Sequence, residues 1–216
     1  MKIERIELRN VVPSVFASKD LSASQVWSCN LTLERGKNYL ISAESGTGKS
    51  SLCSFVYGYR QDFSGIIAID GNDVKSLSVE RWCELRTHNI AYLPQDMRLF
   101  GELTALENVE LKNGITSWKN KHEILEMFSR LGIEDKFNSL VSRMSIGQQQ
   151  RVAIIRSLCQ PFDFLLLDEP VSHLDELNND VVSHLVMEEA DRQGAAVIAT
   201  SVGNNVKIRI DKELKL

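Results

Sequence analysis

The chain has 216 residues, a formal net charge of −4, a hydrophobic fraction of 43% and a charged fraction of 25%. These values are ordinary for a globular protein, and the length suffices for one large domain with a subdomain. The negative charge and the lack of a basic stripe argue against a nucleic-acid partner, because binding to a phosphate backbone requires clustered lysine and arginine side chains.

Neither a membrane span nor a secretion signal is visible in the sequence. No apolar run approaches the roughly 20 residues that cross a bilayer, and the first residues, MKIERIELRN, contain no signal-peptide core. We therefore expect the protein on the cytosolic side, where any membrane role comes through a partner. The cysteines have no CxxC spacing and are expected to be reduced thiols in the core: Cys29, Cys53, Cys83 and Cys159.

Predicted strands and helices alternate along the chain. Apolar or alternating runs predict strands at 3–9, 26–33, 39–42, 65–71, 89–95, 164–170, 195–200 and 206–210. Helices are predicted at 49–59, 79–86, within 104–140, at 147–158 and at 178–192. This alternation indicates an α/β fold with a parallel sheet covered on both faces. The helical stretch between Gln95 and the 164–170 strand is expected to form an inserted subdomain.

A glycine-rich turn between the 39–42 strand and the 49–59 helix has the spacing of a phosphate-binding loop. Backbone N–H groups and the dipole at a helix N-terminus bind phosphate, and glycines let the backbone approach it closely. Lys49 would contact the β- and γ-phosphates, and the Ser50 hydroxyl would bind magnesium. The alternative, a chance Gly-Lys-Ser turn, fits this strand–loop–helix setting poorly. The candidate nucleotide-binding residues of the loop are Ala43, Glu44, Ser45, Gly46, Thr47, Gly48, Lys49, Ser50 and Ser51.

An acidic pair follows the continuous apolar run at 164–167. Ligands of open α/β sheets bind at the carboxyl ends of the strands, where Asp168 and Glu169 would lie. Asp168 would hold magnesium, directly or through water, and Glu169 would act as general base toward the attacking water. Taken alone, the pair could equally be a strand followed by an acidic helix cap, but the phosphate loop favours the catalytic interpretation.

The segment Met144–Arg151, MSIGQQQR, resembles the LSGGQQQR signature of ABC (ATP-binding cassette) ATPases. The resemblance covers nearly the whole chain. It implies a single domain over 1–216 with a RecA-like P-loop NTPase core, an N-terminal antiparallel β subdomain and an α-helical subdomain inserted at approximately 97–158. It also implies an ATPase that uses magnesium and works as a pair of cassettes. Ser145, Gly147 and Gln148 would then contact ATP bound to the other cassette.

Other motifs of this family have counterparts in the chain. Gln95, after a predicted strand, resembles the glutamine that contacts magnesium and links the nucleotide to the helical subdomain. Ser172–Asp175 resembles the D-loop, which places Asp175 at the seam between cassettes. Phe16 stands where an aromatic ring stacks on adenine in such proteins, although a core phenylalanine is the alternative.

The short length and the run Leu103–Val109 resemble the lipoprotein-release, cell-division and macrolide-export branch of the family. Members of this branch serve integral membrane subunits of the permease type. The resemblance therefore implies a cytoplasmic protein held at the inner face of the membrane by its partner. Leu99 and Phe100 would border the groove that receives a coupling helix, although ordinary packing explains any single side chain as well.

The chain departs from the family pattern at several positions. Ala43 replaces the first glycine of the phosphate loop, which mainly eases a turn, so nucleotide binding is expected to survive. Ile146 replaces the first glycine of the signature and could crowd the partner's nucleotide. Ser201 follows Thr200 where the family has a catalytic histidine, and a hydroxyl lacks the reach and charge of an imidazole. The helix usual after this point is also expected to be missing.

These features leave three functions open. The first is a motor ATPase coupled to a membrane permease or mechanotransmitter, possessing slow or partner-dependent hydrolysis. The second is a degenerate cassette that dimerises with ATP as a switch, and the third is a soluble ABC protein of DNA repair or translation. Glu169 favours the first and Ser201 the second. The pair of cassettes is expected to be a homodimer, with a heterodimer also open.

Overall fold

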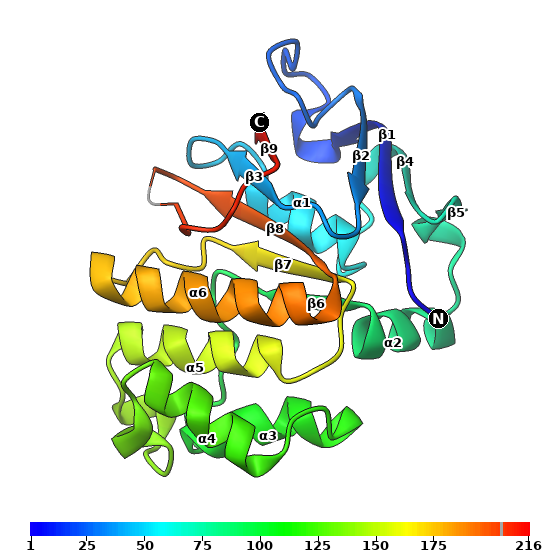
Figure 1. The fold of residues 1–216 in the computed structure, drawn as a ribbon. Coiled ribbons are helices and arrows are strands. Elements are labelled where there is room, and N and C mark those ends of the chain that lie inside the picture. Colours follow the sequence, from blue (N-terminus) through cyan, green and yellow to red (C-terminus); the bar gives the residue numbers. More distant parts are fainter. Residues whose placement is uncertain (204) are drawn as a thin grey trace.

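The computed structural model describes residues 1–203 and 205–216. Its strands form an antiparallel sheet and a parallel sheet, with helices packed around them (Figure 1). This is the mixed α/β architecture that the alternating sequence pattern predicts. None of the helices described combines the length and the apolar composition that a membrane-spanning helix needs.

The antiparallel sheet contains the N-terminal strand. Its strands are β1 (Arg5–Pro13), β2 (Asn30–Glu34), β4 (Phe63–Ile69) and β5 (Asn72–Asp73), in the order β2-β1-β4-β5. In β1, Ile6 and Leu8 are buried whereas Arg5 and Arg9 are exposed, because successive side chains of a strand point to opposite faces. The sheet therefore packs one face against the rest of the protein, as expected for the N-terminal β subdomain.

The parallel sheet forms the centre of the molecule. Its strands are β3 (Tyr39–Ser42), β6 (Ile90–Leu93), β7 (Phe164–Asp168), β8 (Ala196–Ser201) and β9 (Lys212–Lys215), in the order β6-β7-β8-β3-β9. Every residue of β7 and β8 is buried, as is usual when both faces of a parallel sheet are covered.

Alternate residues of the sheet enter two different hydrophobic cores. Leu165 and Leu167 of β7 belong to a core that extends through the helices from residue 105 onward. Phe164 and Leu166 belong to a second core, shared with the antiparallel sheet and the helix after the phosphate loop. The strand is therefore packed on both faces, and the ends of such strands carry the candidate site.

The helices are α1 (Lys49–Val56), α2 (Val79–His88), α3 (Ala105–Thr116), α4 (Lys121–Arg130), α5 (Ile146–Leu158) and α6 (Glu176–Gln193). Short 3₁₀ turns lie at Ser14–Phe16, Val74–Ser76, Glu134–Lys136 and Val141–Arg143. Capping boxes start α3, α4 and α5 at Thr104, Asn120 and Ser145, respectively, which satisfies backbone donors that a helix start leaves unpaired. These three helices occupy the predicted insertion, whose limits at 97 and 158 remain a prediction.

The predicted strand at 206–210 is wrong, since the last strand is Lys212–Lys215. The alternation of apolar and polar residues in this segment does correspond to burial, because Val206 and Ile208 are buried. The backbone of this segment, however, is bonded to side chains of α6: Lys207 N donates to Ser183 Oγ at 2.8 Å, and Asn179 Nδ2 donates to Asn205 O at 2.9 Å. An alternating pattern shows which side chains are buried and not which backbone groups pair.

Two further expectations need correction. The strand predicted at 26–33 begins only at Asn30, because Ser24 Oγ accepts from the backbone N–H groups of Val26 and Trp27 and fixes a turn there. Of the cysteines, Cys53 and Cys159 are buried thiols but Cys83 is exposed. The missing helix after Ser201 is confirmed within residues 202–203 and 205–211, none of which is helical.

Candidate nucleotide site

The phosphate loop joins β3 to α1 with glycines where the backbone needs them. Gly46 has φ +79° and Gly48, at the N-cap of α1, has φ +102°, conformations that L side chains rarely adopt. A Cβ at Gly48 would lie 2.8 Å from the Phe16 ring and 3.2 Å from the Trp27 ring. Trp27 Nε1 also donates to Thr47 O at 3.1 Å. The rings of Phe16 and Trp27 therefore pack against the phosphate loop at Thr47 and Gly48.

Ala43 fits the loop without strain. It is absent from the residues with positive φ, so the position does not require glycine, and its N–H donates to Ser201 O at 3.2 Å. This bond ties the start of the loop to the end of β8. The expectation that alanine is tolerated here agrees with its geometry.

Lys49 lies at the first turn of α1 and is only 5% exposed. Its Nζ donates to Glu44 O at 2.7 Å and to Ala43 O at 3.2 Å. The same nitrogen lies 3.6 Å from Glu169 Oε1. The ammonium is thus held at the centre of the loop, close to the acidic pair.

The acidic pair sits at the carboxyl end of β7, where Thr200 of β8 contacts both residues. The Thr200 hydroxyl donates to Asp168 Oδ1 at 2.7 Å and accepts from the Glu169 N–H at 3.2 Å. Glu169 has φ +51°, a left-handed conformation that costs a non-glycine residue free energy and is concentrated at functional sites. Its Oε2 accepts from Gln95 Nε2 at 3.2 Å, so the structure brings these two predicted site residues together.

These elements enclose a cavity of about 450 Å³. Most of the predicted loop residues line it, together with Gln95 and Glu169. The full lining is Val15, Phe16, Ser45, Gly46, Gly48, Lys49, Ser50, Ser51, Gln95, Glu169 and Val202. Phe16 is 7% exposed, so only a small part of its side chain reaches the surface of the cavity.

Some predicted site residues do not line this cavity. Asp168 is 1% exposed and Ser201 is 2% exposed, so both lie beneath its surface. Val202, which follows Ser201, is 45% exposed and lines the cavity instead. The place of a catalytic histidine is thus taken by a buried serine beside an exposed valine.

The signature residues form the start of α5, outside this cavity. Ser145 Oγ accepts from the Gln148 N–H at 3.3 Å, and Gln148 Oε1 accepts from the Ser145 N–H at 3.0 Å. The Ser145 O–H thereby stays available as a donor. Ile146 is 50% exposed, and a Cβ at Gly147 would lie 3.0 Å from His173 O. Asp175 caps α6, accepting from the Asn178 N–H at 2.9 Å.

The oxygen donors of the predicted metal-binding residues suit a magnesium ion that is bound together with phosphate. Among the described residues, no cluster of three or more histidine, cysteine or acidic side chains could hold a metal ion. The oxygens of Ser50, Gln95 and Asp168 are hard ligands of the kind that magnesium takes together with phosphate oxygens and water. These residues therefore fit a magnesium that arrives with the nucleotide.

Val15, Trp27, Thr200 and Val202 were not predicted as site residues. Trp27 acts through a hydrogen bond to a backbone carbonyl, and Thr200 acts through a hydrogen bond to a buried carboxylate. No local sequence motif predicts such contacts. Val15 and Val202 are exposed, at 62% and 45%, whereas the sequence motifs point to their neighbours Phe16 and Ser201. A valine carries no polar group that would mark it, so the sequence alone offers no signal for either position.

A family model described as ABC transporter matches residues 26–172. The lipoprotein-releasing system ATP-binding protein LolD of Shewanella denitrificans is 30% identical over 211 residues, 96% of this chain and 90% of that protein. The macrolide export ATP-binding/permease protein MacB of Vibrio parahaemolyticus is 31% identical over 204 residues, and the match covers 93% of this chain but 31% of that larger protein.

Solved structures agree with these matches. The dimeric structure of a bacterial ABC transporter cassette is 27% identical, with a TM-score of 0.80, and the match covers 97% of this chain and 94% of that one. A post-hydrolysis state of the same cassette, bound to ADP and Pi, is 26% identical, with a TM-score of 0.77 and coverage of 92% and 88%. The chain belongs to the ABC transporter family, as a nucleotide-binding cassette with ATPase activity.

Proposed function

We propose that this cassette hydrolyses magnesium-bound ATP between two cassettes and that the work drives a membrane partner. The observation that carries the proposal is the convergence of Glu169 and Lys49 in one cavity, with Oε1 and Nζ 3.6 Å apart. A carboxylate at that place can accept a proton from water while the ammonium neutralises phosphate charge.

The phosphate loop binds the nucleotide in this proposal. The backbone N–H groups at the start of α1 and the Lys49 ammonium hold the β- and γ-phosphates. Glu169 accepts the proton of the attacking water, and Gln95, bonded to Glu169 at 3.2 Å, fixes the orientation of that carboxylate. Phe16 contacts the adenine with the small exposed part of its side chain.

Magnesium would be held by Ser50, Gln95 and Asp168. When bound, it would neutralise charge on the β- and γ-phosphates. Asp168 is held in one orientation by the Thr200 hydroxyl, and it is buried enough that a water molecule would connect it to the ion. Ser50 is exposed at the start of α1 and would bind directly.

A second cassette completes the site. The Ser145 O–H and the backbone N–H groups at the start of α5 would donate to the γ-phosphate held by the partner cassette, and Gln148 would support Ser145 through their capping box. Asp175 would lie at the seam. The similar dimeric cassette supports this arrangement, and a pair of identical chains is its simplest form.

Turnover is proposed to be slow, or to depend on the partner. Ser201 is buried and offers the cavity no proton donor comparable to an imidazole. Ile146 presents a branched side chain on the exposed start of α5, where it would meet the second nucleotide. Both features hinder closure or chemistry without removing Lys49 or Glu169.

The membrane partner is proposed from the relatives. One is part of a lipoprotein-releasing system and another is an ATP-binding/permease protein. By this proposal the cassette lies in the cytoplasm against the inner face of the membrane, held there by an integral permease-type subunit.

Size-exclusion chromatography of Glu169→Gln tests the shared site. With magnesium-ATP this variant should elute as a dimer, because binding persists while hydrolysis stops. The double variant Ser145→Ala/Glu169→Gln should remain monomeric and is the matched control. If Glu169→Gln binds ATP with the affinity of the wild type yet stays monomeric at every concentration, the composite site is wrong.

A further inference from the structure

One histidine, His173, lies beside the signature residues. It belongs to the loop between the acidic pair and α6, and its side chain is exposed. Its backbone N–H donates to Gln150 Oε1 at 3.1 Å. A Cβ at Gly147 would lie 3.0 Å from His173 O. The backbone of His173 is therefore packed against the start of α5, where the exposed Ser145 and Ile146 also lie.

The loop around His173 is fixed by Gln150, which is only 3% exposed. Its Nε2 donates to Glu169 O at 3.3 Å and to Ser172 Oγ at 3.4 Å, while its Oε1 accepts from the His173 N–H. A buried amide whose donors and acceptor are all engaged holds its partners in one arrangement. The same amide therefore positions His173 and the residue that carries the proposed general base.

The imidazole ring of His173 is oriented by Ser172, whose Oγ lies 3.0 Å from Nδ1. Because this oxygen accepts from Gln150 Nε2, its own O–H can donate to Nδ1. In a neutral imidazole one nitrogen accepts and the other carries the proton, so the proton is then on Nε2. Nε2 makes no hydrogen bond to the described residues, and the exposed ring thus presents an unused donor.

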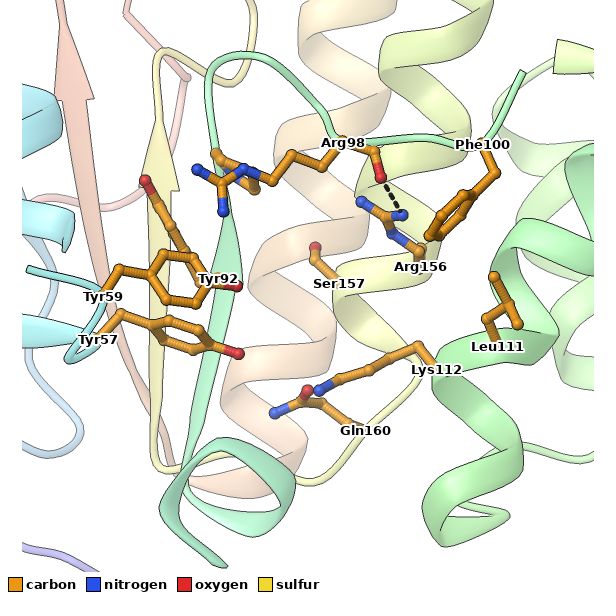
Figure 2. Close-up of a pocket in the computed structure, with 11 residues that line it drawn as sticks. Tyr57, Tyr59, Tyr92, Arg98, Phe100, Leu111, Lys112, Arg156, Ser157 and Gln160 are labelled. Atoms are coloured by element: carbon orange, nitrogen blue, oxygen red, sulfur yellow. Dashed lines mark hydrogen bonds between the residues drawn. The ribbon is translucent and has the colours of Figure 1, made fainter. Parts of the chain in front are cut away.

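The far end of α5 is fixed as well. Arg156 donates to Arg98 O at 2.8 Å, the bond drawn in Figure 2. Between its ends the helix contributes several side chains to the large core. α5 is therefore anchored along its length, and its start presents Ser145, Gly147 and His173 as one rigid group.

The nucleotide cavity lacks the group that His173 carries. Among the described residues that line it there is no histidine, and Ser201 is buried. In the proposed pair of cassettes, the start of α5 covers the γ-phosphate bound to the other cassette. Because His173 packs against Gly147, the same approach brings its imidazole to that phosphate.

We propose that His173 is a catalytic residue for the ATP bound to the opposite cassette, where its Nε2–H donates to a γ-phosphate oxygen. A fixed donor there stabilises the negative charge of the transferring phosphoryl group. The imidazole is not consumed, because the proton of the attacking water still goes to Glu169. The proposal rests on the ATPase function proposed above and deepens it, since only the closed pair then contains an imidazole at each phosphate.

Steady-state phosphate release measures what His173 contributes. His173→Ala should lower kcat by about tenfold or more and change KM little, because the donor acts mainly in the transition state. Ser172→Ala should lower kcat less, since the ring stays but loses its orienting bond. The matched control is His184→Ala, which removes an exposed histidine from α6 and should match the wild type. Glu169→Gln/His173→Ala should still dimerise with magnesium-ATP, which separates chemistry from pairing.

Mixing two variants identifies the site on which His173 acts. A little His173→Ala in a large excess of Glu169→Gln pairs almost entirely with it, so the intact Glu169 faces an intact His173. Turnover should then approach that of a little wild type in the same excess. A little wild type in excess Glu169→Gln/His173→Ala should instead be slow, because its intact Glu169 faces an alanine.

The proposal is overturned if His173→Ala keeps the wild-type kcat, or if the first mixture turns over more slowly than the second, which would place the action of His173 in its own cassette. Failure of the ATPase proposal has a different result, namely an inactive wild type or a Glu169→Gln variant that stays monomeric with ATP.

Discussion

The Thr200 hydroxyl donates to Asp168 Oδ1 at 2.7 Å. The same oxygen accepts from the Glu169 N–H at 3.2 Å, so one side chain of β8 fixes both acids at the end of β7. The Asp168 carboxylate and the Glu169 N–H are buried or nearly so. A water molecule could therefore not replace the Thr200 hydroxyl unless the surrounding side chains rearranged. Thr200 is therefore a positioning residue for the catalytic pair.

Replacing Thr200 by Val should lower both stability and turnover. The substitution keeps the shape but leaves a buried carboxylate and a backbone N–H unpaired, which costs roughly 1–3 kcal/mol. Urea unfolding and phosphate release measure the two effects. Thr200→Ser, which keeps the hydroxyl, should remain close to the wild type. Equal unfolding midpoints for the Val and Ser variants would contradict this role.

Gly48→Ala should abolish nucleotide binding, whereas Gly46→Ala should only weaken it. Both positions have positive φ, but a Cβ at Gly48 would also lie 2.8 Å from the Phe16 ring, and one at Gly46 meets nothing within 4 Å. The clash would displace the start of α1 and with it Lys49. Titration with a fluorescent ATP analogue compares the two variants, and equal affinities would show that contact with the aromatic rings is unimportant.

Arg156→Lys should lower kcat more than it changes KM. Lysine keeps the charge but cannot bridge the carbonyls of Met97 and Arg98 as the guanidinium does. Without these two hydrogen bonds, the segment after Gln95 would be less well fixed, and Gln95 would orient the Glu169 carboxylate poorly. Steady-state phosphate release gives both constants, with Lys121→Met as the matched control. A change confined to KM would indicate a role in nucleotide binding instead.

Ile146→Gly should raise turnover if the exposed isoleucine hinders closure of the two cassettes. The side chain is 50% exposed, so its removal should cost only the helix penalty of glycine, about 1 kcal/mol. Ile146→Ala is the matched control for loss of volume without added flexibility, and it should raise turnover to a smaller extent. Phosphate release below that of the wild type in both variants would show that Ile146 supports the interface.

Stability should respond to pH through Lys112. Its pKa is lowered from 10.5 to about 8 in the folded protein, so between these values the unfolded chain binds more protons than the folded one. Stability contributed by this group therefore rises with pH across that window. The difference in unfolding free energy between wild type and Lys112→Met, measured in urea at intervals of pH, should shift in favour of the wild type as pH rises. A constant difference would contradict the shift.

The sequence predicted the phosphate loop and acidic pair because each is a local pattern next to a strand end. Backbone geometry agrees at Gly46, Gly48 and Glu169. The order of the strands and the contact between Gln95 and Glu169 depend on pairing between distant segments, which a local pattern does not contain. The rule that ligands bind at the carboxyl ends of parallel strands predicts the place of Asp168 and Glu169.

Other features of the fold and the site could not be predicted from local sequence patterns. Residues 206–210 alternate as a strand does, but their backbone partners are side chains of α6. Trp27 and Thr200 support the site through a backbone carbonyl and a buried carboxylate, contacts that only the folded chain reveals. The burial of Ser201 likewise follows from its place at the end of β8, between layers of the fold.

The rate of phosphate release with magnesium-ATP, measured against protein concentration for wild type and Glu169→Gln, tests the central claim most directly. A shared site predicts a wild-type rate that rises faster than linearly with protein concentration and disappears in Glu169→Gln. A rate strictly proportional to protein concentration and unchanged by Glu169→Gln would contradict both the composite site and the role of Glu169 as general base.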